Sequence, residues 1–155
     1  MDVYLFDWGN TLMVDFPNAT GKMCDWEIVE AVTGAKEALE SLSNQSRIYI
    51  ATSAADSTEL EIQQAFERVG LSQFISGYFC KANLGVSKGA PDFLKSILVK
   101  LKVPAANVAM VGDNFDKDIK PAIAAGIKPY WLTNNEVEPV PESVSIIKQL
   151  SALYR

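Results

Sequence analysis

The stretch Val3-Tyr4-Leu5-Phe6-Asp7-Trp8-Gly9-Asn10-Thr11-Leu12 is a short apolar run that stops abruptly at an acid, a glycine and polar residues. Four consecutive apolar or aromatic residues, one of them β-branched, are typical of a buried strand in a parallel sheet. Asp7 therefore falls at the carboxyl end of this strand, where open α/β sheets bind ligands, and Gly9 permits a tight turn after it. These residues alone fit a ligand site and a turn-capping aspartate equally well.

The rest of the chain alternates strand-like runs with segments in which apolar residues recur at helical spacing. We expect strands at residues 3–6, 47–51, 74–79, 107–111 and 129–132, and helices at residues 34–42, 56–69, 91–101, 119–126 and 141–153. Asp56 and Glu59 are expected to form a capping box, and Pro91 is expected in a first helical turn. This alternation predicts an α/β fold, with a three-layer, doubly wound, Rossmann-like parallel sheet of about five strands.

A single domain is expected over residues 1–155, because no linker, repeat or low-complexity segment interrupts the alternation. A chain of this length buries roughly two-thirds of its unfolded surface, so it should fold alone. Residues 13–32 contain Pro17 and Gly21 and have mixed polarity. This segment therefore predicts a loop or flap in place of a cap domain.

Composition narrows the classes of function. The chain has 14 basic and 19 acidic residues and no basic run, so we expect no binding to nucleic acid or to an anionic membrane. Histidine is absent, which excludes mechanisms that use an imidazole. Cys24 and Cys80 lack the spacing of a zinc site or a redox pair, and no secretory signal precedes the first strand. We therefore expect a reduced, cytoplasmic protein without a membrane span.

Carboxylate and hydroxyl side chains follow several of the expected strands. Because parallel strands end at one edge of a sheet, these side chains should converge there. Clustered carboxylates with no histidine favour Mg²⁺, and a lysine and a hydroxyl beside them suit a phosphoryl group. Phosphoryl transfer through an aspartyl phosphate is the reaction that such a set supports. The residues that follow strands are Asp7, Thr52, Ser53, Asp113 and Asp118, and Lys88 opens the helix before the fourth strand.

Four segments, in order, resemble the motifs of the haloacid dehalogenase-like (HAD) hydrolase superfamily. They are Leu5-Phe6-Asp7-Trp8-Gly9-Asn10-Thr11-Leu12, Ile50-Ala51-Thr52-Ser53, Ser87-Lys88-Gly89-Ala90-Pro91, and Val111-Gly112-Asp113 continuing to Asp118. One such motif is weak evidence, but four at the correct spacing over nearly the whole chain are specific. The resemblance implies a HAD-type fold and a phosphatase-like activity that requires Mg²⁺.

The resemblance also implies a role for each motif residue. Asp7 corresponds to the nucleophile and metal ligand, and Gly9 to the residue whose backbone carbonyl binds the metal. Thr52 and Ser53 occupy the phosphate-binding motif, and Lys88 the position that neutralises nucleophile and phosphate. The first acid of the last motif, Asp113, corresponds to a magnesium ligand, and Asp118 corresponds to the acid that orients metal-bound water.

One motif position departs from the family pattern. Members that hydrolyse phosphate monoesters usually have a second aspartate two residues after the nucleophile, which acts as general acid and base, and here that residue is Gly9. Loss of a positioned acid or base costs about 10²–10⁴-fold in rate. Two interpretations remain: a magnesium-dependent hydrolase of phosphate esters or anhydrides that acts through Asp7, and a non-catalytic or nearly inactive phosphate- and metal-binding module.

The absence of a cap predicts an open site. Capless relatives usually act on large phosphorylated substrates or use a neighbouring surface as a lid, because water must still be excluded. An oligomer is compatible with this arrangement. In the segment 13–32, Asp15 and Asp25 are candidates to replace the missing acid, although a solvated surface carboxylate is the simpler interpretation of each.

Overall fold

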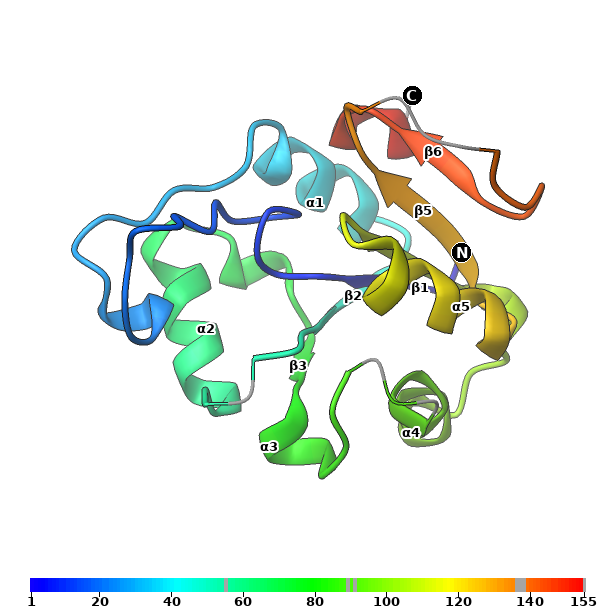
Figure 1. The fold of residues 1–155 in the computed structure, drawn as a ribbon, viewed down its shortest axis with the longest axis horizontal. Coiled ribbons are helices and arrows are strands. Elements are labelled where there is room, and N and C mark those ends of the chain that lie inside the picture. Colours follow the sequence, from blue (N-terminus) through cyan, green and yellow to red (C-terminus); the bar gives the residue numbers. More distant parts are fainter. Residues whose placement is uncertain (55, 89, 91, 136–138, 155) are drawn as a thin grey trace.

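The computed structural model describes residues 1–54, 56–88, 90, 92–135 and 139–154, so the expected place of Pro91 lies outside the described residues. Six parallel strands form one sheet in the order β3-β2-β1-β4-β5-β6 (Figure 1). This confirms the α/β class and the doubly wound parallel sheet, with six strands where about five were expected. The strands are β1 Val3–Phe6, β2 Arg47–Ala51, β3 Gly77–Phe79, β4 Val108–Gly112, β5 Lys128–Leu132 and β6 Ser145–Ile147.

Helices and short helical turns connect these strands. The α-helices are α1 Ala35–Ser43, α2 Glu59–Arg68, α3 Lys81–Leu84, α4 Asp92–Leu101 and α5 Lys120–Ala125. The 3₁₀ turns are η1 Met23–Asp25, η2 Ser72–Phe74, η3 Ala105–Asn107 and η5 Leu150–Leu153, and η4 Phe115–Ile119 is a π-helical turn. In the described part of the chain, no helix has the length and apolar content to cross a membrane.

The central strand β1 is buried along its whole length and fixes the register of its neighbours. Phe6, its last residue, is level with Ile50 in β2 and with Val111 in β4. All these strands run parallel, so the residues that follow them meet at one edge of the sheet. The register therefore brings the ends of three sequence motifs together.

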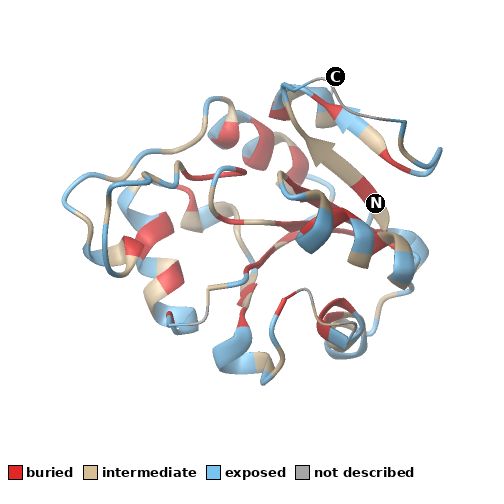
Figure 2. Cartoon of the chain, viewed as in Figure 1, coloured by how far each residue is buried: buried red, intermediate tan, exposed pale blue. Residues whose placement is uncertain are grey.

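Both faces of the sheet are covered by helices. Because side chains alternate along each strand, neighbouring residues of β1 pack on opposite faces. Tyr4 and Phe6 pack in a cluster with the buried residues of α1 and α2. Val3 and Leu5 pack on the other face with the buried residues of α4 and α5. In Figure 1 the two helix pairs lie on opposite sides of the sheet, and Figure 2 shows the buried residues concentrated between them. The three layers expected from the sequence are thereby formed.

The N-cap of helix α2 lies two residues later than expected, at Thr58 in place of Asp56. Its capping box consists of Thr58 and Glu61: the Thr58 hydroxyl accepts the Glu61 N–H at 3.2 Å, and the Glu61 carboxylate accepts the Thr58 N–H at 2.9 Å. The predicted box of Asp56 and Glu59 is therefore wrong. Both pairs have the same three-residue spacing, and threonine supplies the reciprocal cap here.

The C-terminal segment differs more from expectation. The predicted helix at 141–153 is wrong, because residues 145–147 form β6, which pairs with β5, and η5 follows. Val144, Ile147 and Leu150 are buried as a helix would have buried them. Their spacing of three residues fits a strand followed by a 3₁₀ turn as well as an α-helix. The expected strand at 74–79 is likewise shorter, since its first residue belongs to η2.

Residues 13–32, here called the flap, form a loop with one short turn, η1, and contain no cap domain. The two ends of the flap lie together, since Val32 N–H donates to Leu12 O at 2.8 Å and Met13 bridges to Ala31. Its far part is attached to α2: Lys22 Nζ lies 2.7 Å from a Glu61 carboxylate oxygen, and the Arg68 guanidinium donates to flap carbonyls, including that of Cys24 at 3.2 Å. These contacts fix the flap beside the carboxyl edge of the sheet.

Candidate active site

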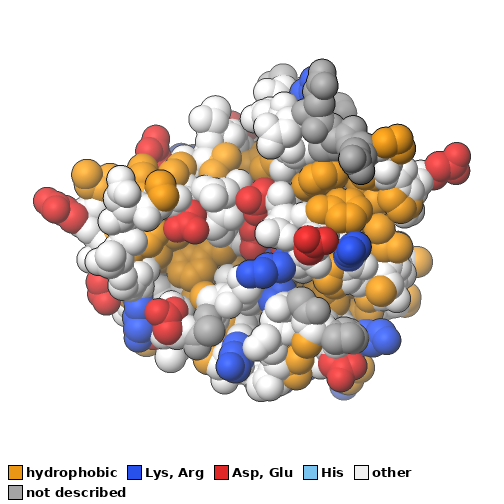
Figure 3. All heavy atoms as spheres, in the orientation of Figure 1, with side chains coloured by type: hydrophobic (Ala, Val, Ile, Leu, Met, Phe, Trp, Pro, Cys, Tyr) orange, Lys and Arg blue, Asp and Glu red, His pale blue; other side chains and the backbone are white. Residues whose placement is uncertain are grey.

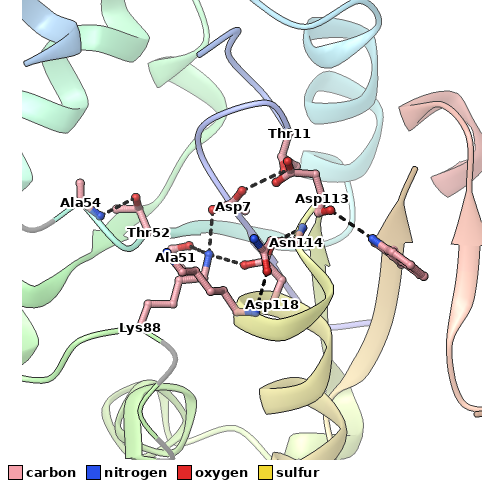
Figure 4. Close-up of polar contacts among 11 residues, drawn as sticks. Asp7, Thr11, Ala51, Thr52, Ala54, Lys88, Asp113, Asn114 and Asp118 are labelled. Carbon is pink, nitrogen blue, oxygen red and sulfur yellow. Dashed lines mark hydrogen bonds and ion pairs between the residues drawn. The ribbon is translucent and has the colours of Figure 1, made fainter. Parts of the chain in front are cut away.

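Three predicted site residues lie at the ends of three adjacent strands. Asp7 follows β1, and its backbone N–H donates to Val111 O at 2.9 Å, which extends the β1–β4 ladder by one bond. Thr52 follows β2, and Asp113 follows β4. Figure 4 shows the side chains of Asp7, Lys88, Asp113 and Asp118 converging at this edge. The expected convergence is therefore seen in the structure.

Lys88 is the positive centre of this group. Its Nζ lies 2.7 Å from Asp7 Oδ1 and 2.5 Å from Asp118 Oδ1, and it donates to the Ala51 carbonyl at 2.7 Å. The side chain is only 2 % exposed. Burial opposes the charge of the ammonium, but the two carboxylates outweigh it and raise the pKa of Lys88. The lysine is therefore held charged, with its ammonium against Asp7.

Three carboxylates meet beside this lysine. One oxygen from each of Asp7, Asp113 and Asp118 lies within 4.8 Å of the others. Burial, followed by the interaction with Asp7 and the charge of Asp118, raises the pKa of Asp113 to about 7. When all three carboxyl groups are ionised, one ammonium leaves two negative charges uncompensated. This donor set fits a divalent cation that prefers oxygen ligands, such as Mg²⁺.

Asp118 is positioned by its own short turn. It lies in η4, almost completely buried, and its Oδ2 accepts the Asn114 N–H at 3.0 Å. The carboxylate packs directly on Gly112, where a Cβ would lie 2.1 Å from Asp118 Oδ2. A side chain at position 112 is therefore incompatible with this placement of Asp118, and the glycine has a steric role in the site.

The hydroxyl residues after β2 lie on the wall next to Asp7. Thr52 is buried, and its Oγ1 accepts the Ala54 N–H at 3.1 Å. A hydroxyl that accepts one hydrogen bond still has a proton to donate, so Thr52 can bind a phosphoryl oxygen. Ser53 is exposed and lines the same cavity.

Thr11 is a site residue whose role the sequence alone did not predict. It is fully buried, and its Oγ1 donates to Asp7 Oδ2 at 3.1 Å and lies 3.4 Å from Asp113 Oδ1. Asp7 is thus held by Lys88 on one oxygen and by Thr11 on the other. The signal available was a threonine four residues after the acid, in the turn that returns the chain to the strand end. Trp131 was also missed, and its indole N–H donates to the Asp113 carbonyl at 3.1 Å.

All predicted site residues line one cavity of about 450 Å³, namely Asp7, Gly9, Thr52, Ser53, Lys88, Asp113 and Asp118. Figure 3 shows acidic and basic side chains around a hollow on this face of the molecule. The flap supplies part of the wall through Lys22, Met23 and Trp26. Of the two flap acids singled out from the sequence, Asp15 lines this cavity, whereas Asp25 lines a separate depression.

A curated protein is similar to this chain in sequence. The chain is 29% identical over 117 residues to ribulose-1,5-bisphosphate 5-phosphatase of Halopiger xanaduensis. The aligned residues are 76% of this chain and 48% of that protein. The chain thus spans about half the length of this curated relative.

Two solved structures share the fold. An uncharacterized protein from Listeria monocytogenes serotype 4b superposes with a TM-score of 0.84 at 21% identity, covering 99% of this chain and 94% of that one. The magnesium-bound HAD hydrolase YfnB of Bacillus subtilis superposes with a TM-score of 0.78 at 16% identity, covering 99% and 96%. Residues 25–126 match the family described as haloacid dehalogenase-like hydrolase. With the match covering more than half of its length and four motifs meeting at one sheet edge, the chain belongs to the haloacid dehalogenase-like hydrolases.

Proposed function

We propose that this chain is a magnesium-dependent hydrolase of phosphate esters or anhydrides that acts through an aspartyl phosphate on Asp7. The placement of the Asp7 carboxylate supports this most directly. It lies at the end of the central strand, between the Lys88 ammonium at 2.7 Å and the Thr11 hydroxyl at 3.1 Å, and it faces the cavity. A carboxylate oriented on both oxygens is preorganised to attack phosphorus.

In the first half-reaction, a carboxylate oxygen of Asp7 forms a bond to phosphorus while the bond from phosphorus to the leaving oxygen breaks. In the second, water attacks the phosphorus of the aspartyl phosphate, which releases phosphate and restores the carboxylate. In this proposal, Lys88 and the Thr52 hydroxyl bind phosphoryl oxygens, and their position beside Asp7 in the cavity wall supports this role. Asp7 and Asp113 would hold Mg²⁺, with the Gly9 carbonyl and Asp118 as the remaining protein groups of the metal site. When bound there, the metal neutralises charge that develops on the phosphoryl group.

The substrate class we propose is a phosphorylated organic molecule that enters an open site. The cavity has polar and apolar walls, with Trp8, Met23 and Trp26 beside the charged residues. The name of the Halopiger xanaduensis relative supports testing sugar phosphates first. Because no cap domain covers the described residues of the site, larger phosphorylated partners also fit this proposal, and so does a lid supplied by a second subunit.

A second candidate is favoured by Gly9. The missing acid at this position supports a binding module that retains the phosphate and metal site but turns substrate over very slowly. Such a module would bind phosphate in the presence of Mg²⁺ through the same residues. Any slow hydrolysis of a phosphate ester in its presence would not depend on Asp7.

The experiment that separates the two candidates is magnesium-dependent release of p-nitrophenol from p-nitrophenyl phosphate. This leaving group needs almost no protonation, so Gly9 does not mask the chemistry. We expect turnover that requires Mg²⁺ and is lost in Asp7→Asn. Asp116→Asn is the matched control, because that aspartate lies in η4 with its side chain 80% exposed. Equal rates in the natural protein and folded Asp7→Asn would contradict the hydrolase and support the binding module.

A further inference from the structure

We propose that Asp15 is the general acid and base of this site, acting from the flap in place of the side chain that Gly9 lacks. This inference rests on the proposed phosphohydrolase function and adds a catalytic residue to it. It explains how a chain with glycine at this position could hydrolyse esters whose leaving group needs a proton.

The first support is the volume that the missing side chain would enter. A Cβ built on Gly9 would meet only atoms of Asp15 as its three nearest neighbours: Cβ at 3.4 Å, Oδ2 at 3.5 Å and Cγ at 3.7 Å. The carboxyl group of an aspartate at position 9 would begin one bond beyond that Cβ. The Asp15 carboxylate therefore lies beside the place where the acid of other family members starts, and it lines the same cavity as Asp7.

The second support is that local hydrogen bonds fix Asp15 at this place. Asn10 adopts the left-handed conformation, with φ of 60°, and reverses the chain directly after Gly9. The Asn10 side-chain oxygen then accepts the Asp15 N–H at 3.0 Å, and Val14 N–H donates to Glu30 O at 2.8 Å. A bridge between Gly9 and Met13 completes the turn. The return of the chain thus places residue 15 against residue 9.

The chemistry assigned to Asp15 balances in both half-reactions. As the bond from phosphorus to the leaving oxygen breaks, the protonated Asp15 carboxyl gives its proton to that oxygen. The resulting carboxylate then takes a proton from the water that attacks the aspartyl phosphate, which returns Asp15 to its starting state. Asp15 is exposed to solvent and so can also exchange protons with water between turnovers.

Other carboxylates of the cavity are less suited to this role. Asp7, Asp113 and Asp118 form the cluster that is paired with Lys88 or with one another. Asp56 also lines the cavity, but from the loop after β2, and it is not among the nearest neighbours of the Gly9 position. Asp56 therefore serves as the rival residue in the test.

The test compares two substrates that differ mainly in their leaving group, p-nitrophenyl phosphate and 4-nitrobenzyl phosphate. Loss of the acid should lower kcat/KM for the benzyl ester, whose alkoxide needs a proton, by about 10²–10⁴-fold. It should lower kcat/KM for the nitrophenyl ester far less, because that leaving group needs almost no proton. We expect this split in Asp15→Asn and not in Asp25→Asn, a flap acid outside the cavity. Equal effects on both esters in Asp15→Asn, or the split in Asp56→Asn instead, would overturn the proposal.

A second pair of variants tests the replacement directly. Gly9→Asp should restore cleavage of the benzyl ester in the Asp15→Asn background, because the new carboxylate then enters space without a competing charge. In the natural background, the same substitution should give no comparable gain, since two carboxylates would share that space. A large gain from Gly9→Asp with Asp15 intact would show that no residue supplies the acid in the natural protein, and would overturn the proposal.

The two proposals fail in different ways. Absence of Asp7-dependent cleavage of the nitrophenyl ester would overturn the hydrolase and this inference with it. Cleavage of that ester that requires Asp7, without the leaving-group split in Asp15→Asn, would leave the hydrolase intact and overturn only the role of Asp15.

Discussion

At the scale of single residues, the absence of a side chain at Gly112 leaves room for the Asp118 carboxylate. An added Cβ would lie 2.4 Å from Asp118 Cγ, so the carboxylate that pairs with Lys88 would have to move. Gly9 offers a contrast, because a Cβ there meets Asp15 at an ordinary contact distance of 3.4 Å. The two glycines of the site thus differ in whether they tolerate a side chain.

We therefore predict that Gly112→Ala lowers the free energy of unfolding by about 1–3 kcal/mol, the usual cost of forcing atoms into a packed site. It should also lower the rate of p-nitrophenyl phosphate cleavage, because Lys88 loses one of its two carboxylate partners. Urea unfolding and the nitrophenol assay measure the two effects, with Gly9→Ala as the control. A Gly112→Ala protein that matches Gly9→Ala in both would contradict the steric role.

Some residues of the candidate site were predictable from the sequence, and others were not. Asp7, Lys88 and Asp113 were identified because each follows or precedes a recognisable element and belongs to a motif, and the structure brings them together. Thr11 was not assigned, because its role depends on a turn geometry that places its hydroxyl between two carboxylates. For Asp15, the sequence shows a carboxylate but not the chain reversal at Asn10 that brings it beside Gly9.

At the scale of elements, helix α2 depends on its first turn for both stability and position. The capping box of Thr58 and Glu61 satisfies two N–H groups that have no partner within the helix. Glu61 also pairs with Lys22 of the flap at 2.7 Å. The start of α2 therefore links the helix to the segment that forms one wall of the cavity.

We predict that Thr58→Ala lowers the free energy of unfolding by about 1 kcal/mol, the typical cost of removing a threonine N-cap. Thr58→Ser keeps a hydroxyl at the same position and should retain most of the stability. The midpoint of urea unfolding, followed by circular dichroism, distinguishes the two variants. Equal losses in alanine and serine variants would show that the cap does not stabilise the helix.

Elements were predictable where their periodicity was unambiguous. The buried strand 3–6 and the amphipathic helix after Gly34 were correct, because each pattern favours one secondary structure. The segment 141–153 was assigned wrongly, because three-residue spacing does not separate a helix from a strand with a 3₁₀ turn. Its choice of strand depends on pairing with β5, a contact between segments that no local pattern reveals.

At the scale of the whole molecule, the acidic cluster couples the fold to pH. The folded pKa of Asp113 is about 7, against an ordinary value of 3.8, so between these values the folded protein holds a proton that the unfolded chain releases. Stability of the metal-free protein therefore falls as pH rises through this window. The raised pKa of Asp118 acts in the same direction, whereas that of Glu61, lowered by Lys22, acts in the opposite direction only in the acid range.

We predict that the melting temperature of the metal-free protein falls as the pH rises from about 5 to about 8. Over most of this range the folded protein holds a proton on Asp113 that the unfolded chain has released. Added Mg²⁺ should raise it more at the higher pH, where it does not compete with the proton on Asp113. Calorimetry with and without Mg²⁺ measures both effects, and Asp113→Asn should weaken them. Equal stabilisation by Mg²⁺ at the two pH values would contradict a metal site at this cluster.

The chain has three tryptophans, and each of them lies at the site. Trp8 and Trp26 line the cavity, and the Trp131 indole is hydrogen-bonded to the Asp113 carbonyl. Indole emission is sensitive to nearby charge and solvent, so all of the tryptophan fluorescence of this protein originates in or beside the candidate site. Binding of Mg²⁺ or phosphate near Asp7 and Asp113 should therefore change the tryptophan emission of the natural chain, and can be followed without an attached dye.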